Sequence, residues 1–231
     1  MQPDKKKIRL RVVAVVPAGI AVNLALGTLV HTLKLPVYLD AVGTIAVTLL
    51  AGLRAGMIVG VASFLIGGVT VNPVLPWFSG TQAVIAIYTY FVAKQGWLRT
   101  GRPSSAGDSG ESSSASGSSR EWLLLNLRPI VCGVGLGVVA GIVSAPVIVA
   151  LFGGITGSGA SLVVAFLLES GQTLFRSVLL SGLASEPLDK TIQLLLAIGL
   201  IRALPSQLRV AFGQADMLAR NALYDKATLH E

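Results

Sequence analysis

Three long stretches of this chain contain no charged residue, and they limit its fold more than any other feature. They cover residues 12–33, 55–93 and 129–168. A run of 18 or more apolar residues is typical of a transmembrane helix, because about 20 residues are needed to cross a bilayer. Only 13% of the residues are charged, about half the share usual in a soluble domain. The pattern predicts an integral membrane protein and argues against a soluble enzyme.

The positions of the basic residues predict the orientation of the helices. The net charge of +7 would suggest nucleic-acid binding in a soluble protein. Here the Lys and Arg residues lie beside the apolar stretches, as the positive-inside rule describes. If both termini are cytoplasmic, all Lys and Arg residues lie on the inner side except Lys34, Arg176 and Lys190. We therefore expect a multi-pass protein of the inner (plasma) membrane, embedded in the lipid bilayer, with both termini cytoplasmic and no nucleic-acid partner.

The chain is expected to divide into two groups of helices joined by a linker. Residues 1–97 hold transmembrane helices 1–4, at 9–33, 40–53, 55–71 and 81–95, and the first is too long for a cleaved signal peptide. Residues 98–121 are rich in Ser and Gly, which predicts a flexible cytoplasmic linker. Residues 122–205 hold helices 5 and 6, at 129–152 and 187–204, with a long outer loop between them, and residues 206–231 form a cytoplasmic tail.

The expected fold is all-α, a six-transmembrane-helix bundle with a re-entrant or interfacial outer segment before the last helix. That segment, residues 162–183, looks helical but carries Glu169, Gln172 and Arg176. Their spacing would place all three on one face of a helix. Six spans also leave a larger excess of basic residues inside than seven would. Whether the segment crosses the membrane or lies at its outer face stays open.

Small residues at four-residue spacing predict two surfaces for close helix packing. Gly133, Gly137 and Gly141 lie on one face of the fifth helix. Ala14 and Ala18 form a similar pair in the first helix. Small residues at this spacing let helix backbones approach closely in lipid. The partner of Ala14 and Ala18 is either this chain or another protein.

No set of residues with catalytic spacing is present. The chain has two His and one Cys, and it lacks a Ser-His-Asp set, a His pair at metal spacing and a phosphate-binding loop. We therefore expect no enzyme activity, no metal and no cofactor. Cys132 lies in an apolar, Gly-rich helix and is expected to be a small buried residue.

Polar residues instead gather near the expected outer ends of the helices, which suits a solute pocket. Lys34, Tyr38 and Glu186 are interpreted as ordinary loop residues among lipid headgroups. Asp189 and Lys190 are expected to open the last helix, where an Asp suits the helix dipole. The wider polar set comprises His31, Tyr38, Asp40, Thr44, Asn72, Trp77, Thr81, Gln82, Thr156, Ser158, Glu169, Gln172, Arg176, Glu186, Asp189 and Lys190.

The chain resembles the substrate-binding (S) components of energy-coupling factor (ECF) type ABC transporters. The segment "YLDAVGTIAVTLLAGLRAGMIVGVASFLIGGVTVNPV" is similar to their short second and third helices with a Gly-containing turn and a Pro-bearing outer loop. The segment "SEPLDKTIQLLLAIGLIRALP" is similar to their last span. The Ala14 and Ala18 pair is similar to the surface that docks on the transmembrane coupling subunit. The linker and residues 158–184 are longer than that family pattern.

The resemblance implies capture of a vitamin or related micronutrient outside the cell and its delivery inward with a coupling subunit and two ATPase subunits. It also implies an outer pocket, and Trp77 would offer a flat face for a ring. The residues that match the pocket positions are Asn72, Trp77, Thr81, Gln82, Thr156, Ser158, Glu169, Gln172 and Asp189.

Three other classes of membrane protein remain open from the sequence. One is a membrane sensor domain, and another is a structural membrane protein. The third is a secondary transporter that acts alone, which would be expected to carry inverted repeats with broken helices. No convincing internal repeat is present in the chain.

Overall fold

The computed structural model describes residues 5–35, 37–98, 115–205 and 212. These residues form an all-helical structure and contain no β-strand, which confirms the expected fold class for this part of the chain. The elements are α1 (Lys5–Thr32), α2 (Val42–Ala51), α3 (Leu53–Thr70), the 3-10 helix η1 (Leu75–Phe78), α4 (Ser79–Lys94), α5 (Ala115–Phe152), α6 (Ala160–Glu169) and α7 (Leu174–Ala203).

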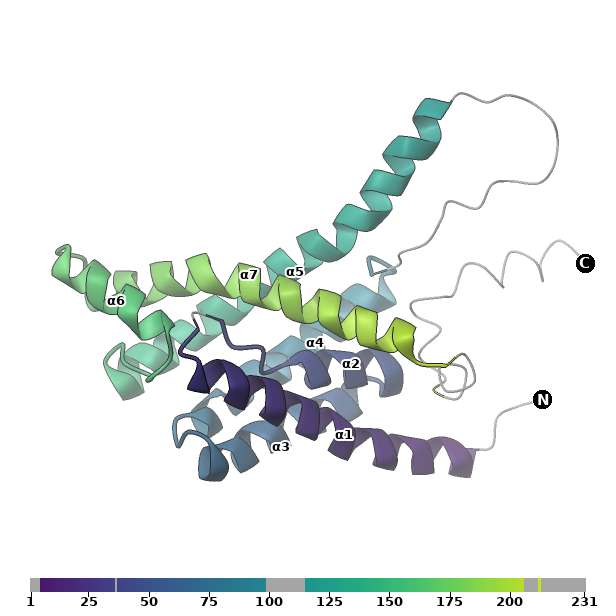
Figure 1. Cartoon of the computed structure of the whole chain (residues 1–231), viewed down its shortest axis with the longest axis horizontal. Coiled ribbons are helices and arrows are strands. Elements are labelled where there is room, and N and C mark those ends of the chain that lie inside the picture. Colours follow the sequence, from purple (N-terminus) through teal and green to yellow (C-terminus); the bar gives the residue numbers. More distant parts are fainter. Residues whose placement is uncertain (1–4, 36, 99–114, 206–211, 213–231) are drawn as a thin grey trace, which may run out of the picture.

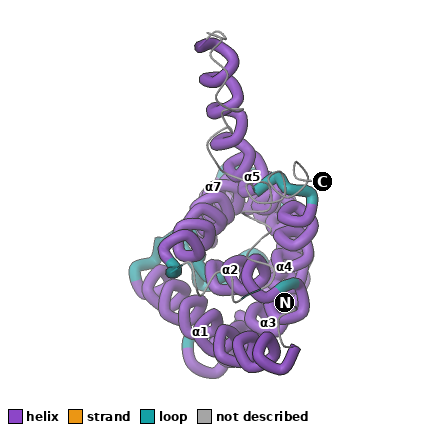
Figure 2. Tube along the Cα trace, turned by 90° about the vertical axis from the view of Figure 1, so that its right-hand side faces the viewer, coloured by secondary structure: helices purple, strands orange, loops and turns teal. Residues whose placement is uncertain are grey.

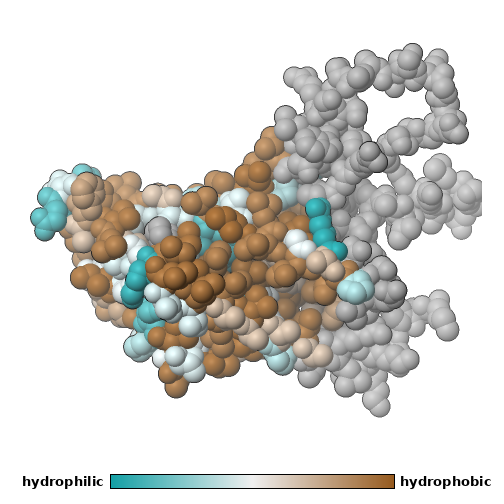
Figure 3. Space-filling view, in the orientation of Figure 1, coloured by the Kyte–Doolittle hydropathy of each residue, from teal (hydrophilic) through white to brown (hydrophobic). Residues whose placement is uncertain are grey.

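Three of these helices are long and apolar enough to cross a membrane. The candidate spans are Ala14–Thr32 in α1, Leu53–Thr70 in α3 and Leu127–Phe152 in α5. Hydrophobic residues cover most of the visible face of the described part, and hydrophilic residues lie mainly towards its left-hand and right-hand ends (Figure 3). These features indicate a membrane protein. The expected number of six spans stays a prediction.

The helices form a bundle with two distinct ends. α1 begins and α7 ends at the same end, on the right in Figure 1, which we call the proximal end. The loops that follow α1, α3 and α5 lie at the opposite end, which we call the distal end, and α6 lies there as well. The first turns of α5 extend away from the bundle at the proximal end (Figures 1 and 2).

The short helix α2 occupies the centre of the bundle. It contacts α1, α3, α4 and α7, and Figure 2 shows these helices around it. Eight of its ten residues are buried, as expected for a helix that is hydrophobic on all sides. At about 1.5 Å per residue, α2 is too short to cross a bilayer.

A sharp turn at Gly52 joins α2 directly to α3. Gly52 has φ 91°, a backbone conformation that residues with a Cβ rarely adopt. The residue is buried, and its N–H donates to the Thr48 carbonyl. The two short helices expected at 40–53 and 55–71, with a tight turn between them, are therefore present at almost the expected positions.

The glycine-rich face of α5 packs closely against α7. A Cβ on Gly133 would lie 2.5 Å from the Cα of Thr191, and one on Gly137 would collide with Pro187 and the Glu186 carbonyl. Gly141 faces Gly182 of α7 across a slightly wider gap. The predicted close-packing surface is confirmed, and its partner is α7. Cys132 on α5 is buried, as expected.

The expected positions of the last two helical segments are wrong. The segment expected at 162–183 is divided by a turn at residues 170–173, between α6 and α7. α7 then runs without a break to Ala203 and contains Pro187 in its interior. Proline is tolerated inside a membrane helix where neighbouring groups satisfy the freed backbone atoms, and here Pro187 packs directly against Gly137 of α5. Asp189 and Lys190 therefore lie in the middle of α7, not at its start.

The boundary of the expected linker also differs. α5 begins at Ala115, so residues 115–121 are helical and do not belong to a linker. The remaining linker residues from 99 to 114 lie outside the described residues, as does the tail except residue 212.

Candidate functional site

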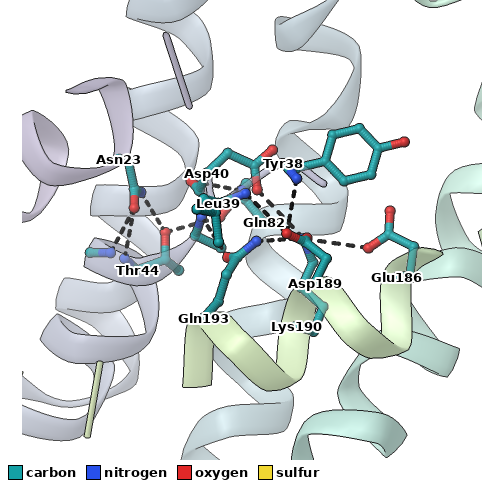
Figure 4. Close-up of polar contacts among 12 residues, drawn as sticks. Asn23, Tyr38, Leu39, Asp40, Thr44, Gln82, Glu186, Asp189, Lys190 and Gln193 are labelled. Atoms are coloured by element: carbon teal, nitrogen blue, oxygen red, sulfur yellow. Dashed lines mark hydrogen bonds and ion pairs between the residues drawn. The ribbon is translucent and has the colours of Figure 1, made fainter. Parts of the chain in front are cut away.

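Two buried side chains of α7 hold the loop that precedes α2 (Figure 4). The Asp189 Oδ1 atom accepts hydrogen bonds from the backbone N–H groups of Tyr38 at 2.9 Å and Leu39 at 3.0 Å. The Gln193 Oε1 atom accepts one from the Ala41 N–H at 2.9 Å, and Gln193 Nε2 donates to Asp189 Oδ2 at 2.7 Å. Buried N–H groups are costly without acceptors, so these two side chains fix the path of residues 38–41.

Lys190 is the centre of a buried group of charges that we call the Lys190 cluster, made of Asp40, Glu186, Asp189 and Lys190. Its Nζ atom lies 2.7 Å from Asp189 Oδ2, 3.4 Å from Glu186 Oε2 and 3.5 Å from Asp40 Oδ1. The same atom lies 5.5 Å from the centroid of the Tyr38 ring, within the range of a cation–π contact. Within this cluster one ammonium group faces three carboxyl groups.

The loop before α2 contributes two groups with shifted pKa values. Burial raises the pKa of the Asp40 carboxyl, although the Lys190 ammonium acts in the opposite direction. Burial also raises the pKa of the Tyr38 phenol, so its hydroxyl stays protonated near neutral pH. The single ammonium of the cluster therefore does not offset the cost of burying the Asp40 charge.

Glu186 is the least satisfied member of the Lys190 cluster. The residue is only 7% exposed. Its Oε2 atom has the ion pair with Lys190 but no hydrogen-bond partner among the described residues. Asp189, in contrast, has an acceptor role in four hydrogen bonds. Because buried carboxylates need hydrogen bonds as well as an opposite charge, Glu186 retains an unused capacity to accept one.

A second buried network joins the first four helices beside the cluster. Asn23 of α1 accepts the Gly43 N–H at 2.7 Å and donates to Thr44 Oγ1 at 2.9 Å and to Ser63 Oγ at 3.1 Å. Thr44 Oγ1 in turn donates to Gln82 Oε1 at 2.9 Å. Asn23, Thr44, Ser63 and Gln82 are all buried. A satisfied polar network of this kind holds the helices in one arrangement.

A cavity of about 120 Å³ lies at the distal end of the bundle, between these two networks. Its walls come from α1, α3, α4, α5 and α7 and from the loops at that end. A cavity of this size is large enough for a small ring or several waters. Its polar lining residues are Asn23, Thr28, His31, Tyr38, Asp40, Ser63, Asn72, Thr81, Gln82, Ser144, Thr156, Ser158, Glu186 and Lys190, and its aromatic walls include Phe64 and Phe78.

Five of the nine residues predicted for a pocket line this cavity. They are Asn72, Thr81, Gln82, Thr156 and Ser158. Asn72 Nδ2 links two distal loops, because it lies 3.3 Å from His31 Nε2 and 3.4 Å from the Thr156 carbonyl oxygen. The cavity thus combines residues from both halves of the chain.

The other four predicted residues lie outside the cavity lining. Trp77 is 59% exposed. Glu169 ends α6 and Gln172 lies in the turn before α7, where both are exposed. The turn separates them from Arg176 in α7, so the expected common helix face is not formed. Asp189 is fully buried and holds the loop before α2.

The interpretation from the sequence is wrong for two lining residues, and the predicted polar set lacks four others, Asn23, Thr28, Ser63 and Ser144. Tyr38 and Glu186 line the cavity, so their interpretation as ordinary headgroup residues is wrong. Lys34, in contrast, is exposed and donates to the Gly157 carbonyl at 3.4 Å. Asn23 and Ser63 could have been predicted from the sequence. A polar side chain within an apolar membrane helix is costly, so it indicates a specific contact inside the bundle.

Comparison with family models, curated proteins and solved structures gives no match to this chain. The features that bear on function are therefore those of the distal cavity itself. In the part of the chain that the structure describes, no group of three or more His, Cys, Asp or Glu side chains is placed to hold a metal. The cavity offers hydrogen-bonding groups, aromatic walls and a buried cluster of charges, which is a composition suited to binding a small polar solute.

Proposed function

We propose that this chain is a membrane-embedded solute-binding protein and acts as the S component of an ECF-type ABC importer. It captures a vitamin or related micronutrient outside and delivers it inward with a coupling subunit and two ATPase subunits. The observation that carries this proposal is the 120 Å³ cavity at the distal end of the helical bundle. Ligand pockets in helical membrane proteins are built between helices, with a few polar groups that orient the solute.

The two halves of the chain meet at this cavity, which supports a role in closing around a solute. Asn72, Thr81 and Gln82 come from the first half, whereas Thr156, Glu186 and Lys190 come from the second. Two direct contacts between the halves at the distal loops are long, at 3.4 Å for Asn72 to Thr156 and 3.4 Å for Lys34 to Gly157, whereas the loop before α2 is held to α7 by bonds of 2.9 to 3.0 Å. A solute that bonds to both halves would strengthen this closure.

The outward face of α1 supports the proposed docking on a coupling subunit. Ala14 and Ala18 are both exposed, and so are Ala21 and Ala25 further along the helix. A surface of small side chains lets another helix approach closely in lipid. Within this proposal, Ala14 and Ala18 form the docking surface.

The charges at the two ends of the bundle support a cytoplasmic proximal end in the plasma membrane. Arg54 lies in the first turn of α3, Lys94 ends α4 and Arg202 lies in the last turn of α7, all near the proximal end. Cytoplasmic ends of membrane helices are enriched in Lys and Arg. The distal cavity then faces outward, and both termini lie in the cytoplasm.

Purification from the native membrane tests this function. ATPase subunits and a larger membrane subunit should co-purify with the tagged chain, and Ala14→Trp should release them. An ion-coupled secondary transporter is the second candidate, since the buried Lys190 cluster is typical of proton or ion pathways. Solute uptake should stop when ATP is depleted and continue when the ion gradients are collapsed. The opposite dependence would favour the secondary transporter.

A further inference from the structure

We propose that the distal cavity selects a small organic cation with a single ring, and that Glu186 accepts a hydrogen bond from its charged nitrogen. This inference rests on the proposed function, because it names the chemical class of the captured solute. It starts from Glu186 Oε2, a buried carboxylate atom without a hydrogen-bond partner among the described residues. Glu186 lines the cavity and is only 7% exposed.

The charge of the cavity wall favours a cation over an anion. Asp40, Glu186 and Lys190 line the cavity, and Asp189 lies directly behind them. Among the described residues that line it, Lys190 is the single Lys or Arg. Its ammonium is already shared by three carboxylates at 2.7 to 3.5 Å. A second cation next to Glu186 and Asp40 would favour the ionised form of both carboxyl groups, whereas an anion would oppose it.

The partners of Lys190 leave Glu186 available for this role. The shortest contact of Lys190 Nζ is to Asp189, at 2.7 Å, and its contact with Glu186 is longer, at 3.4 Å. Asp189 is used by the loop before α2 and by Gln193. Figure 4 shows the Glu186 carboxylate on the side of the cluster that faces the Tyr38 ring. A charged N–H donor at this position would give Oε2 the hydrogen bond that it lacks.

The walls and the volume limit the rest of the solute. Tyr38, Phe64 and Phe78 line the cavity. The Phe78 ring stacks on Phe152 with centroids 6.0 Å apart, which restricts its orientation. Aromatic faces attract both rings and cations. A cavity of about 120 Å³, compared with the roughly 150 Å³ of a cavity that binds benzene, limits the solute to a single small ring.

Three probes that share one ring and differ in charge test this selectivity on the full-length protein in detergent. They are benzylammonium, benzyl alcohol and benzoate, each titrated to millimolar concentration while the dissociation constant is measured by calorimetry. We expect benzylammonium to bind about tenfold more tightly than either of the others. Equal binding of the three probes, tighter binding of benzoate or benzyl alcohol, or no binding of any probe would overturn the inference.

A matched pair of variants locates the selectivity. Glu186→Gln keeps the size of the side chain and removes its charge, and Glu169→Gln makes the same change at an exposed position outside the cavity. The preference for benzylammonium should be lost in Glu186→Gln and kept in Glu169→Gln. A preference that survives Glu186→Gln would contradict the role of Glu186. If Glu186→Gln folds poorly, the comparison of the three probes on the unaltered protein still tests the inference.

The two proposals fail in different ways. If the chain co-purifies with ATPases and transports a neutral or anionic solute, the cation inference is wrong and the importer function stands. If benzylammonium binds with the expected preference but no ATPase associates and uptake is independent of ATP, the importer function is wrong and the cation inference stands.

Discussion

Asp189 and Tyr38 are 151 positions apart in the sequence, yet Asp189 Oδ1 accepts the Tyr38 backbone N–H at 2.9 Å. This bond connects the middle of α7 to the loop at the distal end of α1. It places the Tyr38 ring 5.5 Å from Lys190 Nζ, at the wall of the cavity. Asp189 is therefore a positioning residue for the cavity, although it lies outside the lining.

Replacing Asp189 is expected to destabilise the protein strongly. Asp189→Ala would leave two partly buried N–H groups without an acceptor and the buried Lys190 ammonium without its nearest carboxylate. Removing one partner of a buried ion pair typically costs about 3–5 kcal/mol. Thermal unfolding in detergent should show a clear fall in Tm. Glu169→Ala, at an exposed position, should change stability by less than about 0.5 kcal/mol. Equal Tm values for the two variants would contradict the positioning role.

The close approach of α5 and α7 predicts that a larger residue at position 137 lowers the stability of the protein. A methyl group at Gly137 would collide with the backbone of α7 at Glu186 and Pro187. Overpacking of this kind typically costs about 1–3 kcal/mol, so Gly137→Ala should lower Tm. Gly199→Ala is the matched control, since a Cβ there meets nothing within 4 Å. Gly199→Ala should leave Tm unchanged or raise it, as expected for a better helix former. A harmless Gly137→Ala would show that the two helices can separate at low cost.

The exposed small residues of α1 predict a separation of binding from transport. Ala14→Trp and Ala18→Trp should leave solute binding and Tm unchanged, because both residues are exposed. Both should abolish uptake, since a bulky side chain prevents close approach of a partner helix. Ala165→Trp on the exposed face of α6 should leave uptake intact. Loss of solute binding in the α1 variants would instead assign this surface to packing within the chain.

The orientation is testable with single cysteines. Cys132 is buried, so Cys132→Ser gives a background for labelling. Thr173 lies in the distal turn before α7, and Gln95 follows the proximal end of α4. A single cysteine is introduced at each of these positions, as Thr173→Cys or Gln95→Cys. A membrane-impermeant maleimide applied to intact cells should label Thr173→Cys and not Gln95→Cys. The reverse pattern would place the cavity on the cytoplasmic side and exclude capture from outside.

The elements predicted correctly from the sequence are those set by local patterns. The turn between α2 and α3 depends on Gly52, and the packing of α5 depends on glycines at four-residue spacing. The continuity of α7 is not predicted from the sequence, because proline usually ends a helix, and the packing of Pro187 against Gly137 involves a distant part of the chain.

The residues that line the cavity can be predicted only in part, because some of them reach it through contacts between distant parts of the chain. Asn72 lies in a Pro-bearing loop that is visible in the sequence, and Thr81 and Gln82 follow that loop. Glu186 reaches the cavity because α7 continues through Pro187, and Tyr38 reaches it because Asp189 and Gln193 hold its loop. Contacts over such long separations carry no local signal, so these two residues could be assigned only from the structure.

The central claim is that the distal cavity binds the transported solute, and a melting-temperature screen of vitamins and their precursors tests it most directly. One solute should raise Tm with increasing concentration, by about 2.7 kcal/mol of stabilisation at a hundredfold excess over its dissociation constant. Asn72→Ala, which alters the cavity lining, should weaken its binding by about 1–3 kcal/mol. Gln172→Ala, at an exposed turn outside the cavity, should leave its binding unchanged. If no solute shifts Tm, or if binding is indifferent to Asn72→Ala, the cavity is not the solute site.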